Sequence, residues 1–237
     1  MAGGALLLSA AMTGCGTVSD LIGGESEFAQ APAEEIFTAA KKDIKSLDAV
    51  HVKGNVTEDG KKLSVDLSVS RSGECRGTAT IDGASLDVLV AEKRAFLRPS
   101  AEFLEQMGQS PEQARKLALS LGDRWIEGTA NDVADICKFE DWFDASEGGL
   151  KSMGKALPGT VTVGGTVEVA GVETVQLSST GKKGDFSMYV AVDDPHHVVQ
   201  STAANAKTAN GTVSYSEHGI PVDTQLPRPD QIVRAGG

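Results

Sequence analysis

The sequence predicts an α+β fold in which helices cover one large antiparallel β-sheet. The segment LSVDLSVS at 63–70 alternates strictly between apolar and polar residues, which is typical of a strand with one buried and one solvated face. The dipeptides Asp59-Gly60 and Asp82-Gly83 are hairpin-turn signals on either side of this region. Because no Pro/Gly/Ser linker separates the strand-rich first half from the strand-rich second half, we expect one curved sheet rather than two domains.

The expected strands fall into two groups. The first group is LSVDLSVS, ECRGTATI, SLDVLVAEK and RAFLRP, and the second is TVTVGG, TVEVAG, VETVQLSS, DFSMYVAVD, HVVQSTAA and TVSYSE. Their short length, Thr/Val alternation and Gly-bounded breaks fit antiparallel strands joined by tight turns.

Helices are expected before and between these groups. The segment 32–47 places its apolar residues on one helical face, with acids early and lysines late. Ser110 and Gln113 form a capping-box pair around Pro111, and Gly122 ends that helix. The segment 131–146 carries large apolar residues at helix-like intervals. We expect the helices at 32–47 and 110–121 to cover the apolar face of the sheet.

The first fifteen residues have the pattern of an export signal. The apolar run at 2–11 is too short to cross a bilayer and fits a signal-peptide core. The residues MTGC at 12–15 resemble a bacterial lipobox, which implies that Cys15 carries a diacyl lipid. The first basic residue is Lys41, so the basic start of a signal peptide is missing and we expect this signal peptide to be N-terminally truncated. The alternative is a hydrophobic N-terminal strand with an incidental cysteine.

These patterns divide the chain into three parts. We expect residues 1–14 to be the signal peptide, residues 15–31 a flexible tether that begins at the lipid-anchored Cys15, and residues 32–237 a single domain. The predicted location is the outer face of the cell membrane, where the lipid on Cys15 anchors the protein.

The net charge of the chain limits the classes of binding partner that we expect. The formal net charge is -11, which argues against nucleic acid and against adsorption on anionic headgroups. The membrane is therefore expected to be a partner through the lipid anchor alone.

Two cysteines follow Cys15. Cys75 and Cys137 are an even pair in a chain that carries an export signal, which favours a disulfide. Two buried free thiols remain an alternative, and the absence of CxxC spacing disfavours a redox or metal pair.

Enzymatic chemistry has little support in the sequence. The histidines, at positions 51, 196, 197 and 218, lack metal-ligand spacing, and adjacent strand residues such as His196 and His197 point to opposite faces. The SxxK motif at 152–155 has no S-D-N or K-T-G partner. We therefore expect no catalytic residue, no metal and no cofactor.

The order of features resembles a known family. The lipobox, GECRGTATIDGASLDVLV, LGDRWIEG, ICKFEDWFD, MYVAVDDPHHVV and VSYSEHGIPVDTQLPRPDQIV together resemble actinobacterial lipoproteins of the LolA/LppX/LprG-like group. The resemblance implies a strongly curved antiparallel β-sheet, a half-barrel covered by α-helices, whose concave apolar side accepts acyl chains.

Two functions follow from the resemblance. The first is a cell-envelope lipoprotein that binds or carries a lipid or lipoprotein acyl chain, and the second is an envelope sensor or interaction module that regulates a membrane protein partner. The side chains expected to contact an acyl ligand are Val65, Leu67, Leu86, Val88, Val90, Leu117 and Leu121. From alternation alone these residues form a well-packed core, and the cavity is what the resemblance implies.

Overall fold

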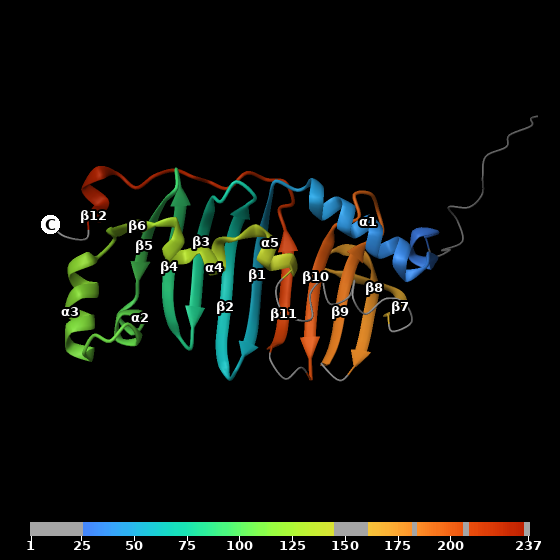
Figure 1. Cartoon of the computed structure of the whole chain (residues 1–237), viewed down its shortest axis with the longest axis horizontal. Coiled ribbons are helices and arrows are strands. Elements are labelled where there is room, and N and C mark those ends of the chain that lie inside the picture. The colour runs from blue at the N-terminus through green and yellow to red at the C-terminus, as the bar shows by residue number, and fades with distance from the viewer. Residues whose placement is uncertain (1–25, 145–160, 182–183, 206–208, 235–237) are drawn as a thin grey trace, which may run out of the picture.

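The structure is a computed structural model that describes residues 26–144, 161–181, 184–205 and 209–234. In this part of the chain, twelve strands form one open sheet, and most of the helices lie against it (Figure 1). The predicted signal peptide, Cys15 and the SxxK motif all lie outside the described residues.

Along the chain, strands come before and after a central region that is rich in short helices. The strands are β1 (Ala49–Glu58), β2 (Lys61–Ser70), β3 (Cys75–Ile81), β4 (Ala84–Ala91), β5 (Arg94–Pro99), β6 (Trp125–Thr129), β7 (Val161–Val169), β8 (Val172–Gly181), β9 (Gly184–Ala191), β10 (Val198–Ala204), β11 (Ala209–Ser216) and β12 (Ile232–Arg234). Their spatial order is β12-β6-β5-β4-β3-β2-β1-β11-β10-β9-β8-β7.

Strand β1 joins the two halves of the sheet. It pairs antiparallel with β2 on one side and with β11 on the other, so Val52 lies between Leu67 and Tyr215. Every other neighbouring pair is also antiparallel except β12 and β6, which are parallel. This confirms the expected α+β fold with one large, mostly antiparallel sheet.

Some elements differ from the sequence prediction. TVTVGG and TVEVAG form the single strand β7, whose pairing with β8 shifts between Val163 and Thr166. The prediction of two strands was wrong because Gly164 and Gly165 mark a bulge rather than a turn. Strands β1, β6 and β12 were not predicted, although Asp59-Gly60 indicated a strand on each side of it.

Two glycines allow neighbouring strands to approach closely. Gly77 in β3 has φ +147°, and a Cβ there would lie 2.0 Å from the carbonyl oxygen of Asp66 in β2. Gly211 in β11 has φ +157°, and its Cβ would lie 2.1 Å from the carbonyl oxygen of Asn55 in β1. Glycine inside a strand often marks a bend, and these two flank the centre of the sheet.

The helices are short. They are α1 (Ala33–Ser46), α2 (Ala101–Gln106), α3 (Pro111–Leu121), α4 (Ala134–Cys137) and α5 (Phe139–Asp144), with 3-10 turns at η2 (Phe28–Gln30), η3 (Ala130–Val133) and η4 (Pro229–Gln231). The predicted Ser110–Gln113 capping box is present at α3. The helix-like segment at 131–146 is divided among η3, α4 and α5.

The helix α3 does not cover the sheet as predicted. It packs mainly against α2, and α2 in turn contacts β4 and β5. The expectation was wrong because the cover in the middle of the sheet comes from η3, α4 and α5 instead, whose buried residues belong to the main apolar cluster.

Ordered structure begins before Pro32. Residues 26–31, which we predicted as the end of the tether, include η2, where Ala29 is buried. The Phe28 ring stacks on the His196 ring with centroids 3.6 Å apart. The rest of the predicted tether lies outside the described residues.

Candidate functional site: the helix-covered face

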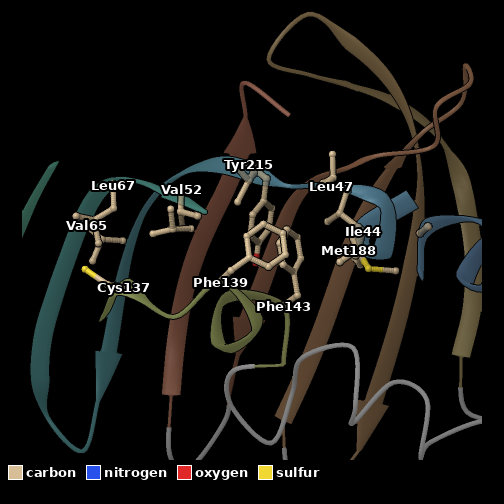
Figure 2. Packing of buried hydrophobic residues seen from close by; sticks show 14 of the residues in the cluster. Ile44, Leu47, Val52, Val65, Leu67, Cys137, Phe139, Phe143, Met188 and Tyr215 are labelled. Atoms are coloured by element: carbon tan, nitrogen blue, oxygen red, sulfur yellow. The ribbon is translucent and has the colours of Figure 1, made fainter. Parts of the chain in front are cut away.

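One face of the sheet is apolar along most of its width. We call it the helix-covered face because α1, η3, α4 and α5 lie over it (Figures 1 and 2). Its side chains alternate along each strand with those of the opposite face, which we call the open face. The buried strand residues of the helix-covered face are Val50, Val52, Val65, Leu67, Val69, Cys75, Ala79, Leu86, Val88, Val90, Ala95, Val175, Leu177, Met188, Val190, Val198 and Tyr215.

Five of the predicted ligand contacts lie together on this face. They come from β2 and β4, the two neighbours of β3, and all belong to the main cluster: Val65, Leu67, Leu86, Val88 and Val90. They are at most 7% exposed. The structure therefore places them where the face is covered, as the alternation of both strands predicts.

The other two predicted contacts lie elsewhere. Leu117 and Leu121 are on α3, outside the residues of the main cluster. Leu121 is buried, whereas Leu117 is 39% exposed. These two leucines do not line the helix-covered face because α3 packs on α2 at one end of the sheet (Figure 1).

Aromatic side chains fill the middle of the face. Phe139 and Phe143 project from α5 towards Tyr215 of β11 (Figure 2). The Phe143 and Tyr215 rings stack with centroids 4.9 Å apart, and Phe139 and Phe143 are 5.3 Å apart. Aromatic pairs bury apolar area and also prefer particular ring arrangements. These contacts therefore fix the position of α5 on the sheet.

Burial makes the Tyr215 hydroxyl a weaker acid than an exposed tyrosine. Desolvation raises the pKa of the Tyr215 hydroxyl to about 12. The hydroxyl therefore stays protonated, and it donates to the carbonyl oxygen of Trp142 at 2.9 Å. The Ser201 hydroxyl lies 3.1 Å away as a second partner. This buried polar group thus fastens α5 to β11.

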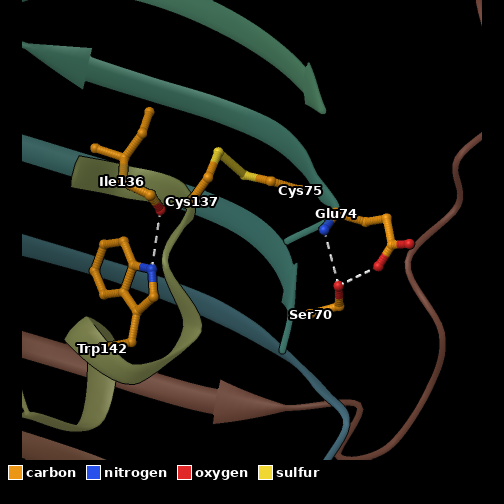
Figure 3. Close-up of a disulfide and its surroundings, with 6 residues drawn as sticks. All are labelled: Ser70, Glu74, Cys75, Ile136, Cys137 and Trp142. Carbon is orange, nitrogen blue, oxygen red and sulfur yellow. Dashed lines mark hydrogen bonds between the residues drawn. A yellow bond between two sulfur atoms is a disulfide. The ribbon is translucent and has the colours of Figure 1, made fainter. Parts of the chain in front are cut away.

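A disulfide ties α4, the helix that precedes α5, to the sheet. Cys75 at the start of β3 is bonded to Cys137 at the end of α4, with Cα atoms 5.4 Å apart (Figure 3). This confirms the predicted pairing. The Trp142 indole Nε1 donates to the carbonyl oxygen of Ile136 at 3.0 Å, which ties α5 back to α4.

The turn before Cys75 is stabilised by its own polar groups. The backbone nitrogen of Glu74 donates to Ser70 Oγ at 2.9 Å, and the Ser70 hydroxyl donates to the Glu74 carboxylate (Figure 3). The hydrogen bonds from Ser70 and Ser72 lower the pKa of Glu74. These hydrogen bonds therefore fix the turn that positions Cys75 for the disulfide.

Arg71 connects the two covering helices. Its Nη2 donates to the carbonyl oxygen of Ile44 at 3.0 Å and its Nε to that of Leu47 at 3.2 Å, at the end of α1. Its Nη1 pairs with Glu140 of α5 at 2.9 Å, and its guanidinium carbon lies 4.4 Å from the Phe139 ring centroid. Cations are favourable at helix C-termini, so Arg71 stabilises α1 and couples it to α5.

Two histidines lie where α1 meets the C-terminal half of the sheet. The His197 and His218 rings stack with centroids 4.2 Å apart, and His218 Nε2 lies 3.0 Å from the carbonyl oxygen of Val198. Among the described residues, Nδ1 of His197 and Oδ2 of Asp43 in α1 have no hydrogen-bond partner, and both atoms are buried. Desolvation is the main cause that lowers the pKa of both histidines.

The open face is polar over β1 and β2. His51 Nε2 lies 2.8 Å from Asp66 Oδ1, and Lys53 Nζ lies 2.7 Å from Asp66 Oδ2. The hydrogen bond from Lys53 is the largest cause that lowers the pKa of Asp66. Further along the sheet, Arg98 Nη2 pairs with Asp87 at 2.8 Å.

A search for metal and membrane elements was negative in the residues described. Within 26–144, 161–181, 184–205 and 209–234, no three His, Cys, Asp or Glu residues are grouped to hold a metal ion. No helix in the same ranges combines the length and apolarity needed to span a bilayer.

The fold is that of two solved mycobacterial structures. The structure is similar to the lipoprotein LppX of Mycobacterium tuberculosis, with a TM-score of 0.51 and 15% identity over 82% of this chain and 100% of LppX. It is also similar to LprF of Mycobacterium bovis, with a TM-score of 0.52 and 17% identity over 87% of this chain and 99% of LprF. The chain has the fold of these actinobacterial lipoproteins. No family model and no curated protein matches the sequence.

Sequence reasoning missed some residues that build the site. Arg71 and Tyr215 were not singled out, because Arg71 lies in a turn and the partner of Tyr215, Trp142, is distant in sequence. Phe139, Trp142 and Phe143 were recognised as an apolar series, but their packing on β11 depends on contacts across 73 residues of sequence. Only the paired cysteines signalled that this segment returns to the sheet.

Proposed function

We propose that this protein is a non-enzymatic envelope lipoprotein that holds an acyl chain between the helix-covered face and its helices. The observation that carries the proposal is the apolar surface that β1–β5 and β8–β11 present to α1 and α5. The fold shared with LppX and LprF supports it. Burying an acyl chain on such a surface is favourable by about 0.8 kcal/mol for each methylene, before the costs of binding.

Entry of a chain requires the cover to move. The disulfide fixes α4 to β3, whereas α1 is held by its apolar stripe, by Arg71 and by the junction near His197. We therefore assign the opening to α1 rather than to α4. The central aromatic group around Phe143 would remain in place.

Organic extraction followed by lipid mass spectrometry of natively purified protein tests the proposal. An acyl lipid anchored on Cys15 stays with the protein, so extracted species report a non-covalent ligand. We expect acyl lipids in reproducible stoichiometric amounts. Their absence would contradict the carrier function.

A matched pair of variants sharpens this test. Ala79 of β3 lies on the helix-covered face and Thr80 beside it lies on the open face. Ala79→Leu adds bulk to the space that the ligand would occupy, so we expect it to lower the amount of co-purified lipid. Thr80→Leu should carry as much lipid as the wild type. Circular dichroism melting confirms that both variants fold.

The close packing of the same face supports a second candidate, an interaction module that regulates a membrane partner without carrying lipid. Phe139, Phe143 and Tyr215 already occupy the middle of the face. This candidate predicts empty protein in the extraction experiment and a specific envelope protein in cross-linking.

We further propose that Cys15 is the site of lipid anchoring and that the protein is held at the outer face of the membrane. The lipobox-like MTGC at 12–15 supports this proposal. Fractionation of cells that express the wild type or Cys15→Ser tests it. The wild type should sediment with membranes, and Cys15→Ser should not be lipidated. Equal membrane association of both proteins, with an unmodified Cys15 in the wild type, would contradict it.

A further inference from the structure

The open face carries a groove that the proposed function does not use. Residues after β11 lie along one end of the sheet and reach the open face beside β3, β4 and β6 (Figure 1). Gly219 N donates to the carbonyl oxygen of Ala49 at 2.8 Å, and Arg76 Nη1 donates to Asp223 Oδ2 at 2.8 Å, which fix this segment. Between the segment and the strands lies a groove of about 340 Å³.

The floor of the groove is apolar. Leu89 of β4 is 2% exposed and belongs to a second apolar cluster with Ala91 and Phe96. Trp125 of β6 and Leu226 of the C-terminal segment pack against this cluster, and both also line the groove. The floor is therefore part of a packed core and is formed before any ligand arrives.

The indole of Trp125 is held in place. The guanidinium carbon of Arg98 lies 4.9 Å from the Trp125 ring centroid. Arg98 is itself fixed because its Nε and Nη2 both donate to Asp87 Oδ2, at 3.0 and 2.8 Å. A cation over one face of the ring orients the indole, so that it forms a fixed wall of the groove.

Two arginines lie at the rim of the groove. Arg76 and Arg228 both line it, and none of its lining residues is acidic, in a chain whose net charge is -11. Arg76 pairs with Asp223, and Arg228 Nε lies 3.3 Å from Asp230 Oδ1. Each guanidinium has five N–H donors, so one carboxylate leaves donors for another anion. Both existing ion pairs are exposed and hence weak.

We propose that this groove binds a single-chain carboxylate, with the chain on Leu89, Trp125 and Leu226 and the carboxylate between Arg76 and Arg228. Arginine recognises carboxylates by paired N–H donors, and the apolar floor supplies the surface for the chain. The volume lies at the small end of the range for ligand sites, about 300–1,000 Å³, which suits one chain rather than a two-chain membrane lipid. This site is separate from the helix-covered face and goes beyond the proposed carrier function.

Nuclear magnetic resonance of the full chain tests the proposal with octanoate as the probe. The sequence has two tryptophans, so labelling with ¹⁵N-tryptophan gives two indole N–H signals. Either Trp125→Phe or Trp142→Phe assigns them. We expect octanoate to shift the Trp125 signal in a saturable way. Octanol, which has the same chain and no charge, should bind at least about tenfold more weakly, the loss expected when a charge-assisted hydrogen bond is missing.

Variants separate the groove from other sites. The double variant Arg76→Gln/Arg228→Gln should weaken octanoate binding at least about tenfold. Arg115→Gln/Lys116→Gln, which removes two exposed charges from α3, should change it less than about twofold. Circular dichroism verifies that each variant is folded.

Three results would overturn the proposal. They are a Trp125 signal that does not respond to octanoate, octanol binding as tight as that of octanoate, and unchanged affinity in the Arg76→Gln/Arg228→Gln variant. A shift of the Trp142 signal alone would place the chain on the helix-covered side. That result refutes the groove and leaves the carrier function standing.

Discussion

The two faces of the sheet use the same strands in opposite ways. On the helix-covered face the apolar side chains of most strands merge into one cluster that α1 and α5 cover. On the open face the same strands present ion pairs such as Asp66–Lys53 and Asp87–Arg98, with only a small cluster around Phe96. Alternation along each strand therefore separates a covered apolar surface from a solvated polar surface. The residues of either face can therefore be substituted without changing those of the other.

The largest expected effect comes from a charge placed on the helix-covered face. Val88 is fully buried, so Val88→Asp leaves a carboxylate without a partner and should cost more than about 4 kcal/mol in the free energy of unfolding, enough to prevent folding. Thr80→Asp puts the same group on the open face of the adjacent strand and should cost less than about 1 kcal/mol. Urea unfolding measures both. Similar losses for the two variants would erase the distinction between the faces.

Removal of the disulfide should have the next largest effect. Cys75 and Cys137 are 62 residues apart in sequence, and in the chain-entropy model a loop of this size is stabilised by about 4 kcal/mol. Cys75→Ala/Cys137→Ala should lose about this free energy of unfolding, and reduction of the wild type should have a comparable effect. A protein whose urea midpoint is insensitive to reductant would show that α4 is held by packing alone.

A smaller effect is expected where β2 and β3 approach closely at Gly77. In Gly77→Ala the new Cβ would meet the carbonyl oxygen of Asp66, and the backbone would be strained. We expect a loss of about 3 kcal/mol. Gly165→Ala in β7, where a Cβ has no atom within 4 Å, should change the free energy of unfolding by less than about 0.5 kcal/mol. Equal thermal midpoints for the two variants would contradict a role for Gly77 in the close approach of the two strands.

The smallest effect concerns pH at the junction of α1 with the sheet. Because burial lowers the pKa of His197 and His218, the unfolded chain binds protons at a higher pH than the folded chain does. The free energy of unfolding therefore has its full value above the ordinary pKa of 6.5, where both histidines are neutral in either state. It decreases as the pH falls below 6.5. Asp43 and Asp194 oppose the shift at His197, and His196 adds to it.

Thermal melts between pH 5 and pH 8 measure this dependence. His197→Gln/His218→Gln should reduce the loss of Tm on acidification, because no buried imidazole then has to take up a proton. A double variant with the same pH profile as the wild type would remove these histidines from the account.

Local patterns were sufficient for much of the fold. The alternation of LSVDLSVS, the capping box at Ser110 and the pair of cysteines after Cys15 each depend on neighbouring residues or on composition, and all three predictions were confirmed. The position of α3 was not predictable, because its apolar stripe fits α2 as well as it fits a sheet. The single strand β7 was missed because two adjacent glycines also signal a turn.

The candidate site was predicted less completely than the fold. The five contacts on β2 and β4 follow from strand periodicity, which assigns a residue to a face. Arg71 could not be found in this way because its partners, at the ends of α1 and in α5, are distant in sequence. The groove beside Trp125 likewise depends on where the chain after β11 crosses the sheet.

Quenching of the two tryptophans by a phospholipid with brominated acyl chains tests the central claim most directly. Trp142 packs against the main cluster of the helix-covered face, and Trp125 lies on the open face in a groove too small for a two-chain lipid. In the single-tryptophan variants, we predict saturable quenching of Trp142 in Trp125→Phe and no quenching of Trp125 in Trp142→Phe. Quenching of Trp125 alone, or of neither residue, would contradict an acyl chain held between the sheet and its helices.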